Sequence, residues 1–108
     1  MSIRVAIDDL FEQIGEWGPG YLLTVSDDDR THLLALRPSV VGTGAERVLR
    51  LDAGGGRAVG NATARPAVTL LFPPGDDGYS LVVDGDAAVH GSLVDVRPTS
   101  ALLHRPAP

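Results

Sequence analysis

Apolar residues recur at helical spacing near the start of the chain, and short apolar runs separated by turns follow from residue 21 onward. Over residues 5–17 the apolar positions lie three or four apart and fall on one stripe, formed by Ile7, Leu10, Phe11, Ile14 and Trp17. This spacing predicts an amphipathic helix of about three turns that covers a sheet. The Gly-Pro-Gly sequence at residues 18–20 ends this helix.

The rest of the chain indicates short strands joined by turns rich in glycine, proline and aspartate. The predicted strands cover residues 21–25, 31–41, 47–53, 67–72 and 79–96. Pro38 interrupts the second of them, because proline cannot donate to a ladder, and the last is one long strand or a pair hinged near Asp84–Gly85. A short helix over residues 57–65 ends at Pro66, and a final helical turn begins at Pro98. The pattern predicts a mainly antiparallel barrel with one N-terminal helix.

The composition limits the class of protein. The 108 residues fit one domain, and 44% apolar with 21% charged residues is ordinary for a soluble protein. The net charge is −5 and all nine basic residues are arginine, so we expect no nucleic-acid or anionic-membrane partner. Cysteine is absent, which excludes a disulfide framework. The start MSIRVAIDDLF has no signal-peptide core, and no run approaches the roughly 20 apolar residues of a spanning helix, so we expect a cytoplasmic protein.

Residues 50–68 place three consecutive glycines and an arginine between a strand and the short helix. Gly54, Gly55 and Gly56 can adopt positive φ and direct several N–H groups to one point, and a helix start adds partial positive charge. Arg57 at that start opposes the helix dipole unless an anion is bound there. Two interpretations stay open: a phosphate-binding turn, or a structural glycine turn with a solvated arginine.

Motifs for other chemistry are scarce. His32, His90 and His104 are far apart on different predicted elements, so they do not indicate a metal site. The aspartates of residues 26–30 lack the ligand spacing of a calcium loop and are interpreted as a solvated turn. The glycine turn is not a P-loop because the chain has no lysine, and Val59 stands where a dinucleotide-binding fingerprint requires glycine. No side chain stands out as a nucleophile or a general base.

Several runs of the sequence, in their order, resemble the pyridoxamine 5'-phosphate oxidase-like family of flavin-binding split barrels. Residues 20–36, GYLLTVSDDDRTHLLAL, are similar to the family's first hairpin. Residues 49–72, LRLDAGGGRAVGNATARPAVTLLF, are similar to its strand, phosphate turn, short helix and following strand. Residues 78–91, GYSLVVDGDAAVHG, resemble a glycine-flanked strand, and the ending VRPTSALLHRP resembles small members of actinobacterial type. The resemblance covers nearly the whole chain.

This resemblance implies a six-stranded antiparallel split β-barrel over residues 1–108, with an N-terminal helix and short connecting helices. It also implies a homodimer that binds FMN in a cleft at the subunit interface. Arg57 matches the basic residue that holds the cofactor phosphate, and the backbone near residues 34–37 is expected to lie along the isoalloxazine ring. The candidate cofactor-binding residues are Leu34, Ala35, Leu36, Arg37, Asp52, Gly54, Gly55, Gly56, Arg57 and Asn61.

Three functional hypotheses follow from the resemblance. The first is a small flavin-dependent oxidoreductase with an unidentified substrate, in which FMN or a deazaflavin supplies the redox chemistry. The second is a non-catalytic dimeric module that binds or sequesters a flavin or deazaflavin, and the third is a barrel that has lost its cofactor site. Oxidation of pyridoxamine phosphate is not expected, because the chain lacks the longer C-terminal region that contacts this substrate in the family's oxidase.

Overall fold

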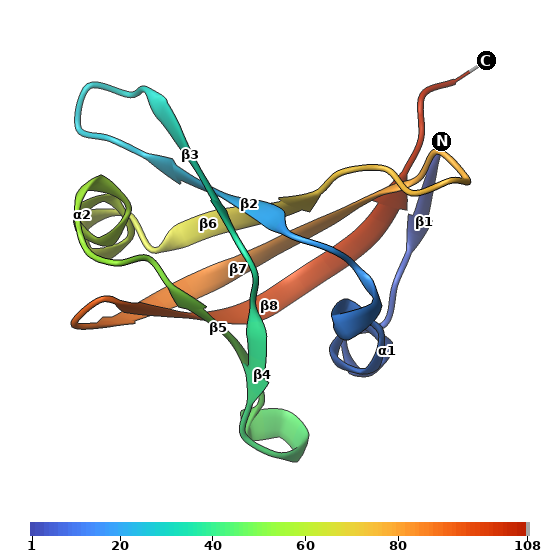
Figure 1. The fold of residues 1–108 in the computed structure, drawn as a ribbon, viewed down its shortest axis with the longest axis horizontal. Coiled ribbons are helices and arrows are strands. Elements are labelled where there is room, and N and C mark those ends of the chain that lie inside the picture. The colour runs from blue at the N-terminus through green and yellow to red at the C-terminus, as the bar shows by residue number, and fades with distance from the viewer. Residues whose placement is uncertain (108) are drawn as a thin grey trace.

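The computed structural model describes residues 1–107, and these form a curled antiparallel sheet with two α-helices (Figure 1). The eight strands are β1 (Ser2–Arg4), β2 (Gly20–Val25), β3 (Thr31–Leu36), β4 (Ser39–Val41), β5 (Val48–Asp52), β6 (Ala67–Phe72), β7 (Ser80–His90) and β8 (Leu93–His104). The helices are α1 (Ile7–Gln13) and α2 (Arg57–Ala64), and 3-10 turns cover Ile14–Glu16 and Gly44–Glu46. No helix within residues 1–107 has the length and apolar character that a membrane crossing requires.

The strand order explains why the sheet curls. The strands pair as β3-β2-β6-β7-β8-β5-β4, all antiparallel, and β1 adds to β8. Strands β3 and β4 stand at opposite ends of this order, although only Arg37 and Pro38 separate them in the chain. The sheet must therefore bend round until its two ends approach each other. The two longest strands, β7 and β8, cross the whole molecule in the middle of the curled sheet (Figure 1).

The expected count of six strands was wrong, and two features account for the eight observed. The predicted interruption at Pro38 is confirmed, and it divides residues 31–41 into two strands that pair with different neighbours. The other addition is β1, whose three residues pair with the end of β8. A strand of three exposed residues buries no apolar face, so its sequence carries no alternation from which to predict it.

The predictions for the C-terminal third were partly wrong. The chain reverses at Gly91–Ser92 rather than near Asp84–Gly85, where the β7–β8 register shifts by one residue instead. The helical turn predicted from Pro98 is part of β8. Pro98 lies opposite Gly85, at this irregularity, which is one of the few places where a sheet accepts proline. Gly85 is required because a Cβ there would lie 2.6 Å from the carbonyl oxygen of Arg97.

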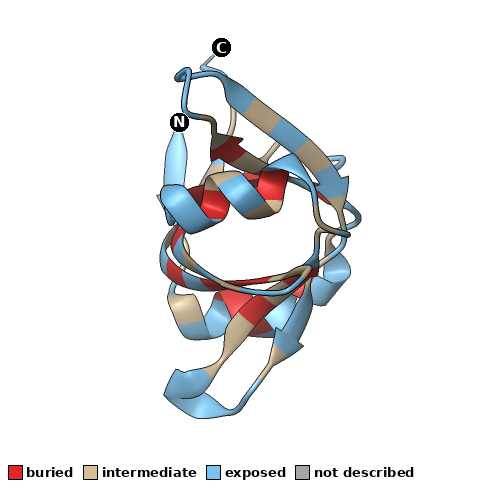
Figure 2. Ribbon diagram, turned by 90° about the vertical axis from the view of Figure 1, so that its left-hand side faces the viewer, coloured by how far each residue is buried: buried red, intermediate tan, exposed pale blue. Residues whose placement is uncertain are grey.

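The core lies between the inner face of the curled sheet and the two helices. Helix α1 begins within the predicted helix of residues 5–17 and contributes Leu10 and Phe11, and Ile14 follows in the adjoining 3-10 turn. Helix α2 contributes only the small residues Ala58 and Ala62. Figure 2 shows buried segments on the helices and on the strands of the curled sheet, interrupted by exposed ones. The sheet contributes the remaining buried apolar side chains, which include Leu22, Leu49, Leu51, Leu70, Phe72, Val83, Val94 and Val96.

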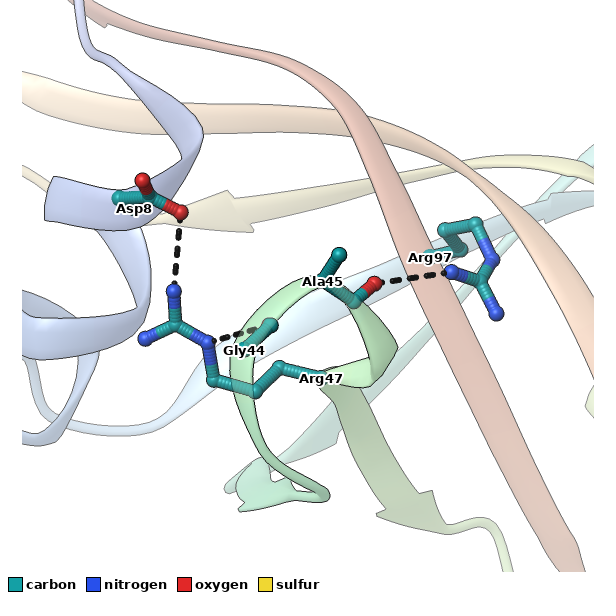
Figure 3. A network of polar contacts seen from close by, with 5 residues as sticks. All are labelled: Asp8, Gly44, Ala45, Arg47 and Arg97. Carbon is teal, nitrogen blue, oxygen red and sulfur yellow. Dashed lines mark hydrogen bonds and ion pairs between the residues drawn. The ribbon is translucent and has the colours of Figure 1, made fainter.

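A polar network fastens the start of α1 to the loop between β4 and β5 (Figure 3). The guanidinium of Arg47 donates from Nη2 to Asp8 Oδ1 at 2.9 Å and from Nε to the Gly44 carbonyl oxygen at 2.9 Å. The same guanidinium lies 4.6 Å from the centre of the Phe11 ring. Arg97 on β8 donates to the carbonyl oxygen of Ala45 at 3.3 Å. These contacts hold α1 over the end of the sheet.

Candidate functional site

The three consecutive glycines form a turn that other residues would strain. Gly54, Gly55 and Gly56 have φ of 67°, 94° and 78°, in the left-handed region that favours glycine. An added Cβ at any of them would meet no atom within 4 Å, so the backbone conformation, not crowding, requires glycine here. The carboxylate of Asp52, at the end of β5, accepts from the Gly54 N–H at 3.0 Å and stabilises the turn.

Helix α2 starts directly after this turn, and its N-terminus is open. Within residues 1–107, no side chain caps its first N–H groups, and its first turn holds no acidic residue. The uncapped N–H groups and the helix dipole concentrate partial positive charge at this point. Arg57, the first residue of the helix, adds a full positive charge and is exposed. The local arrangement is one that attracts an anion.

A cleft of about 630 Å³ lies between this helix and the turn of the β2–β3 hairpin. We call it the α2 cleft, and its lining residues are Ser26, Asp27, Asp28, Arg30, Thr31, His32, Arg57 and Asn61. Figure 1 shows the hairpin turn beside α2 at one end of the molecule. The cleft is therefore built from two segments about 30 positions apart in the sequence, which the curled sheet brings together.

Polar contacts fix α2 against the hairpin. The amide of Asn61 donates to the hydroxyl of Thr24, a fully buried residue of β2, at 3.1 Å. At the other end of the helix, Arg65 forms an ion pair with Asp29 of the hairpin turn at 2.8 Å. These two contacts join one wall of the cleft, α2, to the other, the β2–β3 hairpin.

The cleft contains charges of both signs. Arg30 and Arg57 are its cations, and Asp27 and Asp28 are its anions. The hydroxyl of Ser26 donates to Asp28 and, with backbone hydrogen bonds of the turn and a smaller effect of the Arg57 cation, holds the pKa of this carboxyl below its ordinary value. Asp28 is therefore ionised at neutral pH. An anionic ligand must gain more from the arginines and the helix N-terminus than it loses to these two carboxylates.

The structure brings some of the predicted site residues together. Arg57 and Asn61 line the cleft, and the glycine turn leads into it from Asp52. Residues 34–37 lie further along β3 and its end, beyond Thr31 and His32, which line the cleft. Among the described residues, β3 pairs with β2 alone, so one edge of its backbone is available to a ligand.

Sequence reasoning missed Arg30 and His32 as members of this site. Arg30 was interpreted as part of a solvated turn, and His32 as an isolated histidine. Neither residue has a motif partner nearby in the sequence. Arg30 and His32 come close to Arg57 only because the strand order places the hairpin turn beside α2. Within residues 1–107, no group of three or more potential metal ligands gathers.

The fold has clear counterparts among solved structures. A FAD-binding protein of Mycobacterium smegmatis matches 97% of this chain and 100% of its own length, with a TM-score of 0.65 and 18% identity. A FAD-binding protein of Mesorhizobium loti matches 95% of this chain and 96% of its own, with a TM-score of 0.64 and 14% identity. A Corynebacterium glutamicum protein described as "Putative pyridoxamine 5'-phosphate oxidase" covers 99% of this chain and 96% of its own, with a TM-score of 0.59 and 11% identity. These likenesses define a protein of the split-barrel class.

Sequence similarity identifies relatives as well. Uncharacterized proteins of Mycobacterium bovis and Mycobacterium tuberculosis are each 36% identical over 96% of this chain and 82% of their own length. No family model matches the sequence. The chain belongs to one family with these two mycobacterial proteins, and its fold is the split barrel of the pyridoxamine 5'-phosphate oxidase-like proteins. The resemblance stated from the sequence is confirmed.

Proposed function

We propose that the chain binds a flavin whose phosphate lies in the α2 cleft. The observation that carries this proposal is the convergence of Arg30, Arg57 and the uncapped N-terminus of α2 on one cleft. Arginine forks and helix N–H groups are the donors that phosphate oxygens favour. The FAD-binding proteins of M. smegmatis and M. loti, which share the fold, support a flavin as the ligand.

Each part of the site has a distinct role in this proposal. Arg57 and Arg30 pair with the phosphate oxygens, and the first N–H groups of α2 donate to the same oxygens. The open backbone edge of β3 near residues 34–37 offers N–H and C=O groups to the polar edge of the isoalloxazine ring. A bound flavin supplies the electron or hydride transfer itself, so the protein acts as an oxidoreductase on a small substrate without a nucleophilic side chain.

We propose FMN as the particular flavin; the titration below separates it from FAD, and a deazaflavin is the alternative ligand if none of the flavins binds. Freshly purified protein should show flavin absorbance in the visible range. The fluorescence of added FMN should decrease when the protein binds it. Titration with FMN, FAD and riboflavin then ranks the ligands. Tighter binding of FMN than of riboflavin supports a phosphate site. Equal binding of these two contradicts it, and binding of none of the three contradicts a flavin function.

The redox role needs a separate measurement. A flavin-dependent oxidoreductase should have its bound flavin reduced by a nicotinamide donor or by a candidate substrate under anaerobic conditions. A protein that binds flavin and is reduced by none of these is instead the binding or sequestration module.

We also propose that the protein works as a homodimer formed through the outer face of the sheet. Tyr21 on β2 and Leu33 on β3 leave 38% and 53% of their surface exposed on this face, and Leu23 lies directly opposite Leu33. Exposed apolar side chains on neighbouring strands are typical of an interface between subunits. Light scattering should give twice the monomer mass of 11.3 kDa. The variant Leu33→Glu should shift the mass towards the monomer, and a monomeric wild-type protein would contradict the proposal.

A further inference from the structure

One buried polar atom has no partner. Within residues 1–107, Nδ1 of His32 is the buried side-chain nitrogen or oxygen that makes no hydrogen bond. Buried polar groups are almost always paired, and leaving one unpaired destabilises the fold, so each exception needs a physical explanation. His32 lies on β3 and its side chain lines the α2 cleft, beside both arginines.

The missing partner of Nδ1 bears on which nitrogen of His32 carries the proton. Thr24 is the partner of His32 across the β2–β3 ladder, and the hydroxyl of Thr24 already accepts from the amide of Asn61. Within residues 1–107 nothing forms a hydrogen bond with Nδ1, so a proton there would be a buried N–H without an acceptor. The neutral ring with its proton on Nε2 leaves only a lone pair at Nδ1, which is the less costly arrangement. The enclosure of Nδ1 thus selects the tautomer that carries its proton on Nε2.

The balance of charges in the cleft makes an uncharged donor such as the Nε2–H of His32 useful for binding an anion. The two arginines of the lining are matched by Asp27 and Asp28, so the charged side chains of the lining sum to zero. Net charge alone therefore cannot hold an anion there. A neutral donor with a fixed direction adds a hydrogen bond without drawing in a further counter-charge.

We propose that His32 is a ligand-contacting residue that donates from Nε2 to an oxygen of the phosphate held between Arg30 and Arg57. This assignment rests on the proposed function, because it concerns the same cleft and the same phosphate. It adds a neutral, directional donor to the two cationic ones. His32 then helps to distinguish a phosphate-bearing flavin from riboflavin.

Two variants separate the donor from the bulk of the ring. His32→Leu removes the donor and keeps an apolar side chain, whereas His32→Gln keeps an N–H donor of similar reach. We expect His32→Leu to weaken FMN binding roughly tenfold to a hundredfold and to leave riboflavin binding unchanged, the loss of one hydrogen bond to a charged group. His32→Gln should recover most of the lost affinity. The control is His104→Leu, an exposed histidine at the far end of β8, which should bind FMN like the wild type.

Nuclear magnetic resonance tests the tautomer in the unaltered protein. Long-range proton–nitrogen spectra of the imidazole should show the proton on Nε2 of His32. The Nε2 signal should shift when FMN, or inorganic phosphate as a minimal probe, is added. A proton on Nδ1, or an Nε2 signal that neither probe moves, would overturn the proposal even if a variant failed to fold.

The outcomes distinguish the two proposals. If the wild type binds FMN and His32→Leu binds it equally well, the role of His32 is wrong and the flavin function stands. If His32→Leu loses affinity for FMN and riboflavin alike, His32 acts on the shape of the cleft and not on the phosphate, which also overturns the assignment. If the wild type binds neither FMN nor phosphate, the proposed function fails and the role of His32 fails with it.

Discussion

The two helices of this protein begin in opposite ways. Helix α1 has Asp8 and Asp9 in its first turn, where acidic side chains favour the helix dipole, and Arg47 holds Asp8 in place. Helix α2 begins with Arg57 after a run of glycines and has no acid in its first turn. Neither N-terminus is capped by a side chain of the described residues. The dipole of α1 is complemented by the protein's own carboxylates, whereas the start of α2 is left available to an anionic ligand.

The two helices also differ in how they are attached to the sheet. Helix α1 and the turn after it bury large apolar side chains, whereas α2 buries only two alanines. Because alanine offers little apolar area, α2 is held by the half-buried Val59 and by its polar contacts with the β2–β3 hairpin. Helix α1 thus stabilises the fold, while α2 shapes a binding cleft.

Removing a large side chain from α1 should cost the most stability. Leu10 is 1% exposed, and we expect Leu10→Ala to lower the free energy of unfolding by about 3 kcal/mol, from the lost burial and the cavity left behind. Urea unfolding measures this loss. FMN affinity of the folded fraction should stay at the wild-type value. A loss below about 1 kcal/mol would show that α1 does not carry the core as described.

Glycine substitutions on either side of the start of α2 should have opposite signs. Gly55 has φ of 94°, so Gly55→Ala should destabilise the protein by roughly 1–2 kcal/mol through backbone strain. Gly60→Ala, inside α2 and with nothing near its Cβ, should stabilise by roughly 0.5–1 kcal/mol. Thermal unfolding compares the two variants. Equal effects would contradict the conformational explanation of the glycine turn.

The polar network at the start of α1 should contribute less to the free energy of unfolding than the buried side chain of Leu10. Arg47 contacts both Asp8 and the ring of Phe11, and Arg47→Ala should lower the free energy of unfolding by about 1 kcal/mol, largely through the ring contact. Asp8→Asn should lose less than about 0.5 kcal/mol, because the carboxylate is 87% exposed. If Asp8→Asn proves the more damaging variant in urea unfolding, the ion pair and not the ring contact dominates.

A weak pH dependence of stability should arise from an ion pair between two strands, β5 and β8. Arg50 on β5 binds both carboxylate oxygens of Asp95 on β8, at 2.8 and 2.9 Å, and holds the pKa of Asp95 below its ordinary value. Asp95 has a lower pKa in the folded state than in the unfolded chain, where an aspartate has a pKa of about 3.9. The ion pair therefore stabilises the fold fully above this pH, and the stabilisation is lost as the pH falls through the lower pKa of the folded state.

Unfolding in urea at a series of acidic pH values measures this contribution. Asp95→Asn should flatten the decline of stability below about pH 4, because the variant has no carboxyl to protonate. FMN binding at pH 7 should be unchanged. An identical decline in the variant would show that other carboxylates set the acid response.

Much of the fold could be predicted because its signals are local. The apolar stripe of α1, the alternation of β6 and the glycine turn before α2 each express one physical preference over a few residues. The β7–β8 hairpin was predicted incorrectly because its irregularity depends on a contact across strands. Pro98 is tolerated in β8 because it faces Gly85, and that pairing cannot be recognised from either residue alone.

The same limit applies to the candidate site. Arg57 and the glycines could be identified because they adjoin one another in the sequence. Arg30 and His32 could not, because they reach the cleft only through the pairing of β3 with β2 and of β2 with β6. The buried and unpartnered nitrogen of His32 is likewise a property of packing, and no sequence pattern encodes it.

If the start of α2 binds a phosphate, Arg57→Ala should weaken the binding of phosphate-bearing flavins selectively. FMN and riboflavin are titrated against the wild type, Arg57→Ala and the control Arg4→Ala, which removes an exposed arginine of β1. We expect Arg57→Ala to weaken FMN by roughly tenfold to a hundredfold, the loss of a charge-assisted contact of about 1.5–3 kcal/mol. Riboflavin affinity and stability without ligand should barely change, and Arg4→Ala should match the wild type. Equal losses for both flavins, or no loss for either, would contradict the phosphate role of Arg57.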